Sequence, residues 1–349
     1  MTHQEYLLHL AQRNVAIYTN DPNVKAIALG GSLPLGRGTA YSDIDMLLMY
    51  DDKLDYDRLQ EACAHNGGER RQLLNESEEA CLEIYYVGGV ECQFSHAPVS
   101  FYSQQIELLL VEHSLEQMPH LVADGMLGAL PLHGEAFLAQ LLEPLRTFPD
   151  ELAVKMVEAN VRPLPAAELR HRIMRERDLL RFYAVMPKTL EHMLKTLLGL
   201  NRQYIQGEWK RLDLLTDRLT LAPVDLLNRM NTAMQSEQYA ALDILDALWR
   251  ETVELVRRHM SEVDLTEADK RLNYTVKPIE LPEQKKRPTC GGTIKNCDEW
   301  HFVKVFIAPI SRAGARPGLR LLHQRRSRRW RRLSRPHWRG GRWRRNRRR

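Results

Sequence analysis

The feature that most constrains the fold of this chain is residues 30–45, where a Gly-Gly-Ser turn is followed by Ser-Asp-Ile-Asp. Apolar runs at 24–29 and 44–50 flank this stretch and predict two strands. Side chains alternate faces along a strand, so we expect Asp43 and Asp45 side by side on one face. Two carboxylates this close repel each other unless a cation lies between them. The pattern therefore predicts a cation site that suits Mg²⁺, which prefers hard oxygen ligands and substrate phosphates.

The turn at Gly31 and Ser32 has the features of a phosphate-binding turn. Glycine lets the backbone approach a phosphate closely, and a helix start after such a turn presents free amides to an anion. The Ser32 hydroxyl is a further donor. No Gly-Lys-Ser/Thr follows the glycines, which excludes an ATP-binding loop of the Walker type.

A third acid is expected from a predicted hairpin. Residues 82–87 and 90–95 form two strand patterns joined by Gly88 and Gly89, a two-residue turn. Alternation along the second strand places Glu91 on the polar face, where it could join the aspartate pair. Each of these pieces alone is common in loops and exposed strands. Their combination at this spacing predicts a catalytic site with Glu91 as the third carboxylate.

These motifs resemble those of the polymerase β-type nucleotidyltransferase superfamily, in particular its small-molecule branch with the kanamycin and lincosamide nucleotidyltransferases. The resemblance covers residues 1–100. It implies an α+β fold with a small mixed sheet and a site at one sheet edge. It also implies two Mg²⁺ ions and a nucleoside triphosphate, with ATP as the first choice. The implied metal ligands and catalytic residues are Asp43, Asp45 and Glu91, and the implied nucleotide-binding residues are Gly31, Ser32 and Ser42.

One departure from the family pattern concerns Arg37. Members often carry a basic residue three positions after the serine, where this chain has Leu35. Arg37 follows two positions later, after an inserted Leu33-Pro34. We therefore expect Arg37 either to bind a phosphate of the nucleotide or to be a solvated loop arginine.

The chain divides into three predicted parts: a nucleotidyltransferase domain at 1–100, an all-helical domain at 101–275, and a basic, disordered tail at 276–349. The first part begins with a helix at 2–19 that has Thr2 as its N-cap. In the helical part, residues 125–131 are expected to form a turn between two helices. Prolines are expected to separate further helices, at Pro163, Pro165, Pro187 and Pro223.

Two segments of the helical part offer further site residues. Glu176, within the charged segment 171–178, is a second candidate for the general base besides Glu91, although a solvated helix face explains that segment equally simply. Lys210 is a candidate for binding the triphosphate, and Tyr204 for stacking on a base. Ordinary packing and a surface lysine are the alternatives.

Charge bears on the acceptor. Residues 1–284 contain 28 basic and 43 acidic residues, and an acidic cleft attracts a cationic acceptor more readily than an anionic RNA. The acidity either steers a cationic acceptor to the site or only aids solubility. The predicted reaction moves a nucleoside monophosphate to a hydroxyl of a small acceptor, for which a cation is one candidate. A protein or RNA acceptor and a non-catalytic, antitoxin-like module with the same fold stay open. A homodimer is among the assemblies that the sequence leaves open.

The C-terminal part is a different kind of sequence, because residues 285–349 carry 22 basic and two acidic residues. It is either an Arg/Trp arm that binds nucleic acid or the product of out-of-frame, GC-rich DNA. The five scattered cysteines suit a reducing compartment, so a cytoplasmic protein is expected. No run of 18 apolar residues predicts a membrane span, and the N-terminus has no signal-peptide pattern.

Overall fold

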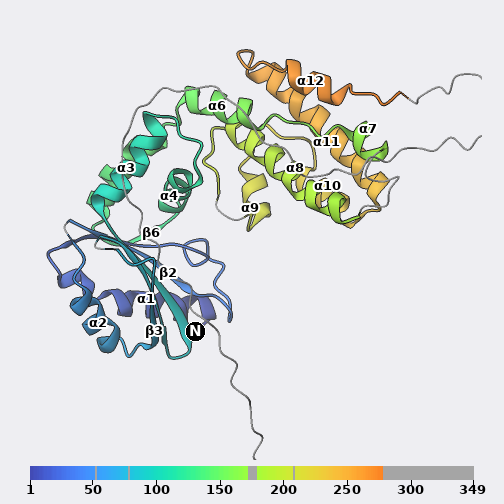
Figure 1. The fold of residues 1–349 in the computed structure, drawn as a ribbon. Coiled ribbons are helices and arrows are strands. Elements are labelled where there is room, and N and C mark those ends of the chain that lie inside the picture. Colours follow the sequence, from blue (N-terminus) through green and yellow to red (C-terminus); the bar gives the residue numbers. More distant parts are fainter. Residues whose placement is uncertain (52, 78, 172–178, 207–208, 278–349) are drawn as a thin grey trace, which may run out of the picture. The chain divides into compact units, whose positions relative to one another are not determined.

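The computed structural model describes residues 1–51, 53–77, 79–171, 179–206 and 209–277, all within one compact unit, Met1–Leu281. The fold combines one mixed six-stranded sheet with many helices, which confirms the predicted α+β class (Figure 1). From residue 278 on, the predicted tail lies outside the described residues. The expected division at residue 100 stays a prediction.

The sheet has the strand order β3-β4-β5-β2-β1-β6. β2 and β5 run parallel, and all the other neighbouring strands are antiparallel. The strands are β1 (Val24–Leu29), β2 (Ile44–Tyr50), β3 (Glu69–Leu74), β4 (Cys81–Val87), β5 (Val90–Pro98) and β6 (Leu130–His133).

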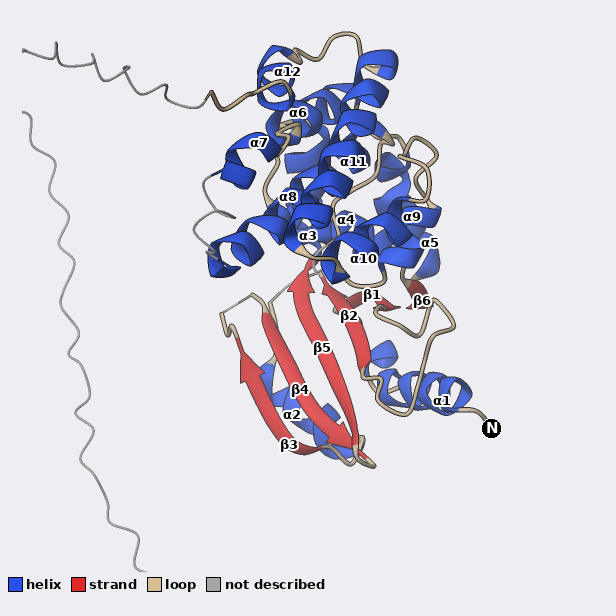
Figure 2. Cartoon of the chain, turned by 90° about the vertical axis from the view of Figure 1, so that its right-hand side faces the viewer, coloured by secondary structure: helices blue, strands red, loops and turns tan. Residues whose placement is uncertain are grey.

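The helices pack on both faces of the sheet. α1 (His3–Val15) and α2 (Tyr56–His65) share one buried core with Ile27 and Phe94, and Figure 2 shows α2 behind β3, β4 and β5. The small side chains of Ala26 and Ala28 point to the other core, which continues into the helical region. That region contains α3 (Val99–Leu110), α4 (Gln117–Leu127), α5 (Glu135–Leu142), α6 (Asp150–Asn160), α7 (Ala166–Leu169), α8 (Leu179–Leu200), α9 (Leu212–Asp217), α10 (Leu226–Gln235), α11 (Gln238–His259) and α12 (Thr266–Leu272).

Two predicted local structures are confirmed. The Thr2 hydroxyl accepts a hydrogen bond from the Glu5 amide, and the Glu5 carboxylate accepts one from the Thr2 amide, so the first helix begins with a capping box. That helix ends at Val15 rather than at 19, and a short 3₁₀ turn follows. Gly88 and Gly89 both have positive φ and form the two-residue turn between β4 and β5.

The prediction of a turn at 125–131 is wrong at both ends, because only Gly128 and Ala129 lie between regular elements. Gly125 lies within α4, and Leu130–His133 forms the edge strand β6, paired with β1. A four-residue strand that contains Pro131 has too little periodicity to be predicted, and proline is tolerated at a sheet edge. Gly134 has φ +66°, and a Cβ there would lie 2.1 Å from the Lys25 carbonyl oxygen. The chain can therefore pass this close to β1 only with glycine.

The expectation that Pro187 separates two helices is also wrong. Pro187 lies inside α8, which continues to Leu200. A proline within a helix costs about 3 kcal/mol because it removes one backbone hydrogen bond. Burial of this helix, including Phe182, Met193 and Leu197, against the helical core offsets that cost.

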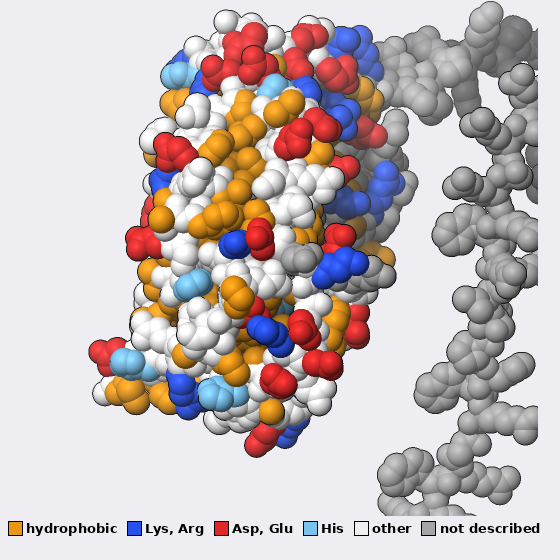
Figure 3. All heavy atoms as spheres, turned by 90° about the vertical axis from the view of Figure 1, so that its left-hand side faces the viewer, with side chains coloured by type: hydrophobic (Ala, Val, Ile, Leu, Met, Phe, Trp, Pro, Cys, Tyr) orange, Lys and Arg blue, Asp and Glu red, His pale blue; other side chains and the backbone are white. Residues whose placement is uncertain are grey.

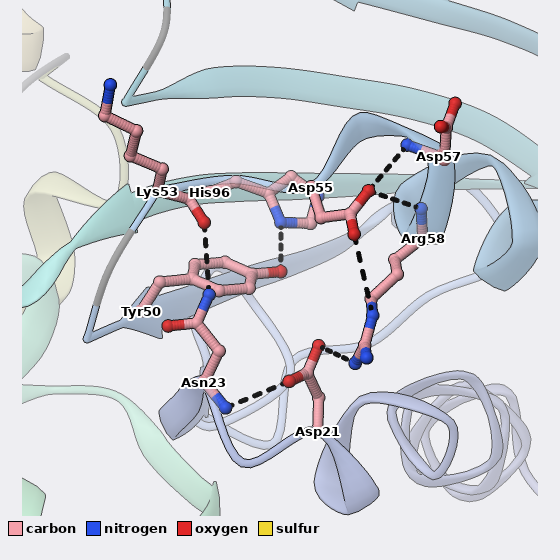
Figure 4. A network of polar contacts seen from close by, with 8 residues as sticks. All are labelled: Asp21, Asn23, Tyr50, Lys53, Asp55, Asp57, Arg58 and His96. Carbon is pink, nitrogen blue, oxygen red and sulfur yellow. Dashed lines mark hydrogen bonds and ion pairs between the residues drawn. The ribbon is translucent and has the colours of Figure 1, made fainter.

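Polar contacts hold the chain at the C-terminal end of β2 (Figure 4). Asp55 caps α2 by accepting hydrogen bonds from the amides of Asp57 and Arg58, and Arg58 forms an ion pair of 2.8 Å with Asp21. The Asn23 side chain donates to the Lys53 carbonyl oxygen. These contacts bind the segment before β1 to the segment after β2.

A buried charged network lies between the sheet and the first two helices. Glu83 is fully buried, and its carboxylate accepts a hydrogen bond from Arg71 Nε (2.5 Å) and lies 3.3 Å from His96 Nε2. His96 Nδ1 shares a 2.9 Å hydrogen bond with the Tyr50 hydroxyl. Burial lowers the pKa of His96, which favours the neutral imidazole. The Glu83 charge is thus balanced mainly by Arg71.

Among the described residues, no helix is both long and apolar enough to cross a membrane.

We expect Glu83→Ala to lower the free energy of unfolding by about 3 kcal/mol, because it leaves the Arg71 guanidinium without its buried counter-charge. Asp51→Ala is the control, since Asp51 pairs with Lys25 at the surface and its loss should cost less than about 1 kcal/mol. Urea unfolding of both variants measures the difference. Equal losses would contradict a buried charge balance at Glu83.

Candidate active site

The two aspartates lie where β2 begins, as the strand pattern predicted. Ile44 and Met46 are buried in the core, so Asp43 and Asp45 share the opposite face. The parallel register pairs Ile44 with Cys92 and Asp45 with Gln93. Because side chains alternate along both strands, Asp43 and Asp45 share their face with the polar side chains of β5.

Glu91 and Gln93 are those polar side chains. Gln93 Nε2 donates to Asp43 Oδ2 at 3.2 Å and to Glu91 Oε1 at 3.0 Å. The other carboxylate oxygen of Glu91 accepts a hydrogen bond from the Tyr86 hydroxyl. The structure thus brings Glu91 beside the aspartates, with the Gln93 amide between two of the three acids.

Gln93 and Tyr86 were not predicted as site residues, although the alternation along their strands could have indicated them. Both alternate with buried residues on their strands, as Glu91 does. The guanidinium of Arg70 lies over the Tyr86 ring, with Cζ 5.7 Å from the ring centre. Tyr86 is therefore held from two sides as it donates to Glu91.

The glycine-serine turn lies directly against Asp45. The Gly30 amide donates to the Asp45 carbonyl oxygen at 2.8 Å, which extends the pairing of β1 with β2 by one residue. Gly31 has φ +73°, and a Cβ there would lie 2.1 Å from Asp45 Oδ2. Only glycine allows the backbone and this carboxylate to approach so closely.

The two predicted serines meet above this turn. Ser32 Oγ and Ser42 Oγ are 3.3 Å apart, and Ser42 Oγ also accepts a hydrogen bond from the Thr39 amide at 3.0 Å. The structure therefore brings Gly31, Ser32 and Ser42 together with the acids, as the sequence predicted. Their contact with a nucleotide stays a prediction.

The pKa of Asp45 shows how the charges of the site interact. Burial raises the pKa of Asp45 to about 6, with the neighbouring charge of Asp43 as the next cause and Glu91 as a smaller one. Arg211 and Lys210 act in the opposite direction and lower it. Two cations from the helical region thus lie close enough to compensate part of the carboxylate charge.

A cavity of about 860 Å³ opens beside the turn. Gly30 and Gly31 line it on one side, and Lys210 and Arg211 contribute to its lining as well. A smaller hollow of about 170 Å³ adjoins Gly30 and Gly31 and contains Asp45 and Gln93. The large cavity and the hollow lined by Asp45 therefore meet at the glycine turn.

The charge of the large cavity differs from the expected acidic cleft. Its lining has two acidic residues, Asp124 and Asp217, and five basic ones, Arg146, Arg202, Lys210, Arg211 and Arg218. The face drawn in Figure 3 mixes acidic, basic and apolar side chains. The acidic excess of residues 1–284 is thus not gathered on the cavity lining. Arg146, Arg202 and Arg218 are paired with Glu143, Asp150 and Asp124, so the lining residues that suit an anionic ligand best are Lys210 and Arg211.

The remaining predicted residues have different outcomes. Arg37 forms an ion pair of 2.7 Å with Asp213 and does not line the cavity. Tyr204 lines the cavity but is mostly buried, with its hydroxyl bonded to the Leu145 carbonyl oxygen and its ring against Phe148. Glu176 lies outside the described residues.

The donor chemistry of the site fits magnesium, since Asp43, Asp45 and Glu91 offer only hard carboxylate oxygens. Among the residues that the structure describes, however, no three His, Cys, Asp or Glu side chains converge as a ready metal cage. Gln93 occupies the space between Asp43 and Glu91. The chemistry of the two aspartates on one strand face therefore fits a metal, whereas Glu91 could join them only if Gln93 moved.

The chain matches no protein-family model and no curated protein. Among solved structures it is similar to a nucleotidyltransferase-like protein from Exiguobacterium sibiricum 255-15, with 14% sequence identity. The similarity covers 74% of this chain and 81% of that chain, with a TM-score of 0.32. A TM-score of this size does not establish a shared fold.

We expect Gly31→Ala to destabilise the protein more than Gly36→Ala. Both glycines have positive φ, but a Cβ at Gly31 would meet Asp45 Oδ2, whereas nothing lies within 4 Å of one at Gly36. Gly36→Ala should cost about 1 kcal/mol of unfolding free energy from backbone strain alone, and Gly31→Ala about 1–3 kcal/mol more. Urea unfolding measures both, and equal losses would contradict the close approach of Asp45.

We also expect Asp45→Asn to stabilise the metal-free protein at high pH. The pKa of Asp45 is raised from 3.8 to about 6, so its ionisation destabilises the fold, and stability is lost as the pH rises from 4 through 6. The variant should gain about 3 kcal/mol at pH 8 and nearly nothing at pH 4. Urea unfolding in EDTA at both pH values tests this, with Asp51→Asn as the control. A gain that is equal at both pH values would contradict it.

Proposed function

We propose that the chain is a nucleotidyltransferase that moves a nucleoside monophosphate, from ATP, to a hydroxyl of a small molecule. The observation that carries this proposal is the contact between the Gly31 turn and Asp45 at the mouth of the large cavity. A phosphate-sized turn, paired carboxylates and a basic cavity wall together suit a metal-bound triphosphate.

The residues of the turn would bind and orient the phosphates. The absence of a side chain at Gly31 leaves room beside Asp45, and the Ser32 hydroxyl is available as a donor next to Ser42. Lys210 and Arg211, which also line the cavity, would add positive charge near Asp45. Such positioning and charge neutralisation account for most of the catalysis in phosphoryl chemistry.

Asp43 and Asp45 would hold magnesium, with Glu91 as a third ligand or as the base. When bound, two such ions neutralise the phosphates and lower the pKa of the attacking hydroxyl. As the base, Glu91 would accept the proton of the acceptor. This role is supported by the hydrogen bonds from Tyr86 and Gln93, which hold its carboxylate beside Asp43. Glu176 remains the alternative base.

The acceptor is proposed as a small molecule with a free hydroxyl. The cavity gives room beside the turn, and its lining mixes apolar side chains such as Leu121 and Phe148 with polar ones such as Gln203. The basic lining supports a role in binding the nucleotide more than a cationic acceptor. A cationic acceptor would have to lie on the side of Asp43, Asp45 and Glu91.

Asp45→Asn should reduce nucleotidyl transfer by about a thousandfold, because it removes one carboxylate of the metal-binding pair while keeping the shape of the side chain. Asp51→Asn should retain the parental rate. The assay is transfer of labelled AMP to a panel of hydroxyl compounds, together with pyrophosphate release.

The same proteins should be heated with ATP and magnesium in a melting experiment. We expect magnesium-dependent stabilisation by ATP in the parent and in Asp51→Asn, and little in Asp45→Asn. Pyrophosphate release by Asp45→Asn at the parental rate would contradict the proposed role of Asp45 as a metal ligand. A parent that neither transfers nucleotide nor responds to ATP with magnesium would favour a non-catalytic module.

A further inference from the structure

The loop that follows the glycine turn is firmly attached to the first helix. Gln4 of α1 donates to the Leu33 carbonyl oxygen at 2.8 Å and accepts from the Gly38 amide at 2.6 Å. Leu33 is 2% exposed, and the Arg37 amide donates to the Ser32 carbonyl oxygen at 3.1 Å. These contacts therefore hold the backbone that carries Arg37 in a defined conformation.

Arg37 connects this loop with α9, which lies far away in the sequence. Its guanidinium Nη2 lies 2.7 Å from Asp213 Oδ2, and the hydrogen bond from Arg37 is the main cause of the lowered pKa of Asp213. Asp213 is the second residue of α9. The neighbours Leu35 and Leu214 line the cavity, but neither Arg37 nor Asp213 does. The half-exposed ion pair thus lies next to lining residues in the sequence but outside the cavity lining.

Lys210 and Arg211 directly precede α9. Arg211 is its N-cap, with the left-handed backbone angles φ 56° and ψ 47°. Both residues line the cavity. Because α9 has only six residues, any displacement of Asp213 is passed on to Arg211 two positions earlier.

The other end of α9 has its own anchor. Arg218, the C-cap, lies 3.3 Å from Asp124 of α4. Leu215 is buried between the two ion pairs. The helix is thus held at both ends, and the anchor next to Arg211 is the one made by Arg37.

We infer that Arg37 is a positioning residue, whose ion pair with Asp213 holds Lys210 and Arg211 in the cavity lining near Asp45, and that it does not bind a phosphate itself. This inference rests on the proposed function. The loop that carries the phosphate turn thus also fixes the position of the basic lining residues Lys210 and Arg211. At Nη2, a phosphate would have to compete with the Asp213 carboxylate, which already lies 2.7 Å away.

The test compares Arg37→Ala, Asp213→Ala, the double alanine variant and the charge exchange Arg37→Asp with Asp213→Arg. Each single alanine variant should raise the KM for ATP about fivefold with little change in kcat, as expected for a half-exposed ion pair. The double variant should be no worse than either single one, because both remove the same interaction. The charge exchange should bring KM back to within about twofold of the parent.

A readout that does not depend on activity is hydrogen exchange of the backbone amides of residues 209–217. Exchange there should increase in both alanine variants and return toward the parental level in the charge exchange. The pair Arg257 and Asp269 provides a matched control, since its distance is also 2.7 Å and its exposures of 44% and 45% match the 43% and 47% of Arg37 and Asp213. Exchanging the charges of that pair should leave both KM and exchange at 209–217 unchanged.

The outcomes separate this inference from the proposed function. If Arg37→Ala raises KM far more than Asp213→Ala, and the charge exchange does not recover it, Arg37 binds the nucleotide and the inference is overturned. Unchanged hydrogen exchange at 209–217 in both alanine variants would overturn it as well. A parent without transfer activity would reject the proposed function, while the exchange data would still decide whether Arg37 positions this segment.

Discussion

The parallel pairing of β2 with β5 is the constraint on which the site depends. In its register Asp45 lies opposite Gln93, so the carboxylates of both strands gather on one face. A shift of one residue would turn either set of side chains into the apolar core. The buried residues Ile44 and Phe94 on the opposite face prevent that shift. The packing of the core thus holds the acids together despite their mutual repulsion.

That repulsion is compensated from two sources. Within the sheet, Gln93 and Tyr86 donate hydrogen bonds to the acids. From the helical region, Lys210 and Arg211 contribute positive charge that counteracts the raised pKa of Asp45. Partly buried like charges are tolerated only where such groups lie nearby. The helical region therefore belongs to the electrostatics of the site and is more than a support for the sheet.

Much of the site could be predicted because strand periodicity is local. The alternation of side chains between two faces is enough to group Asp43 with Asp45 and to place Glu91 and Gln93 on the polar face of their own strand. The pairing of β2 with β5 then brings the two groups together. The continuation of the helix through Pro187 and the formation of β6 were not predictable in this way. Both depend on burial against elements that are distant in the sequence, which outweighs local propensity.

The sequence by itself determined the acid pair, the glycine-serine turn and the hairpin that carries Glu91, because each follows from spacing within a few residues. Only the tertiary structure decided what faces them. It placed Arg211 near Asp45, paired Arg37 with Asp213 and gave the cavity a basic lining within an acidic body. Net charge and local pattern do not specify which distant side chains meet, since long-range packing of the chain makes that choice.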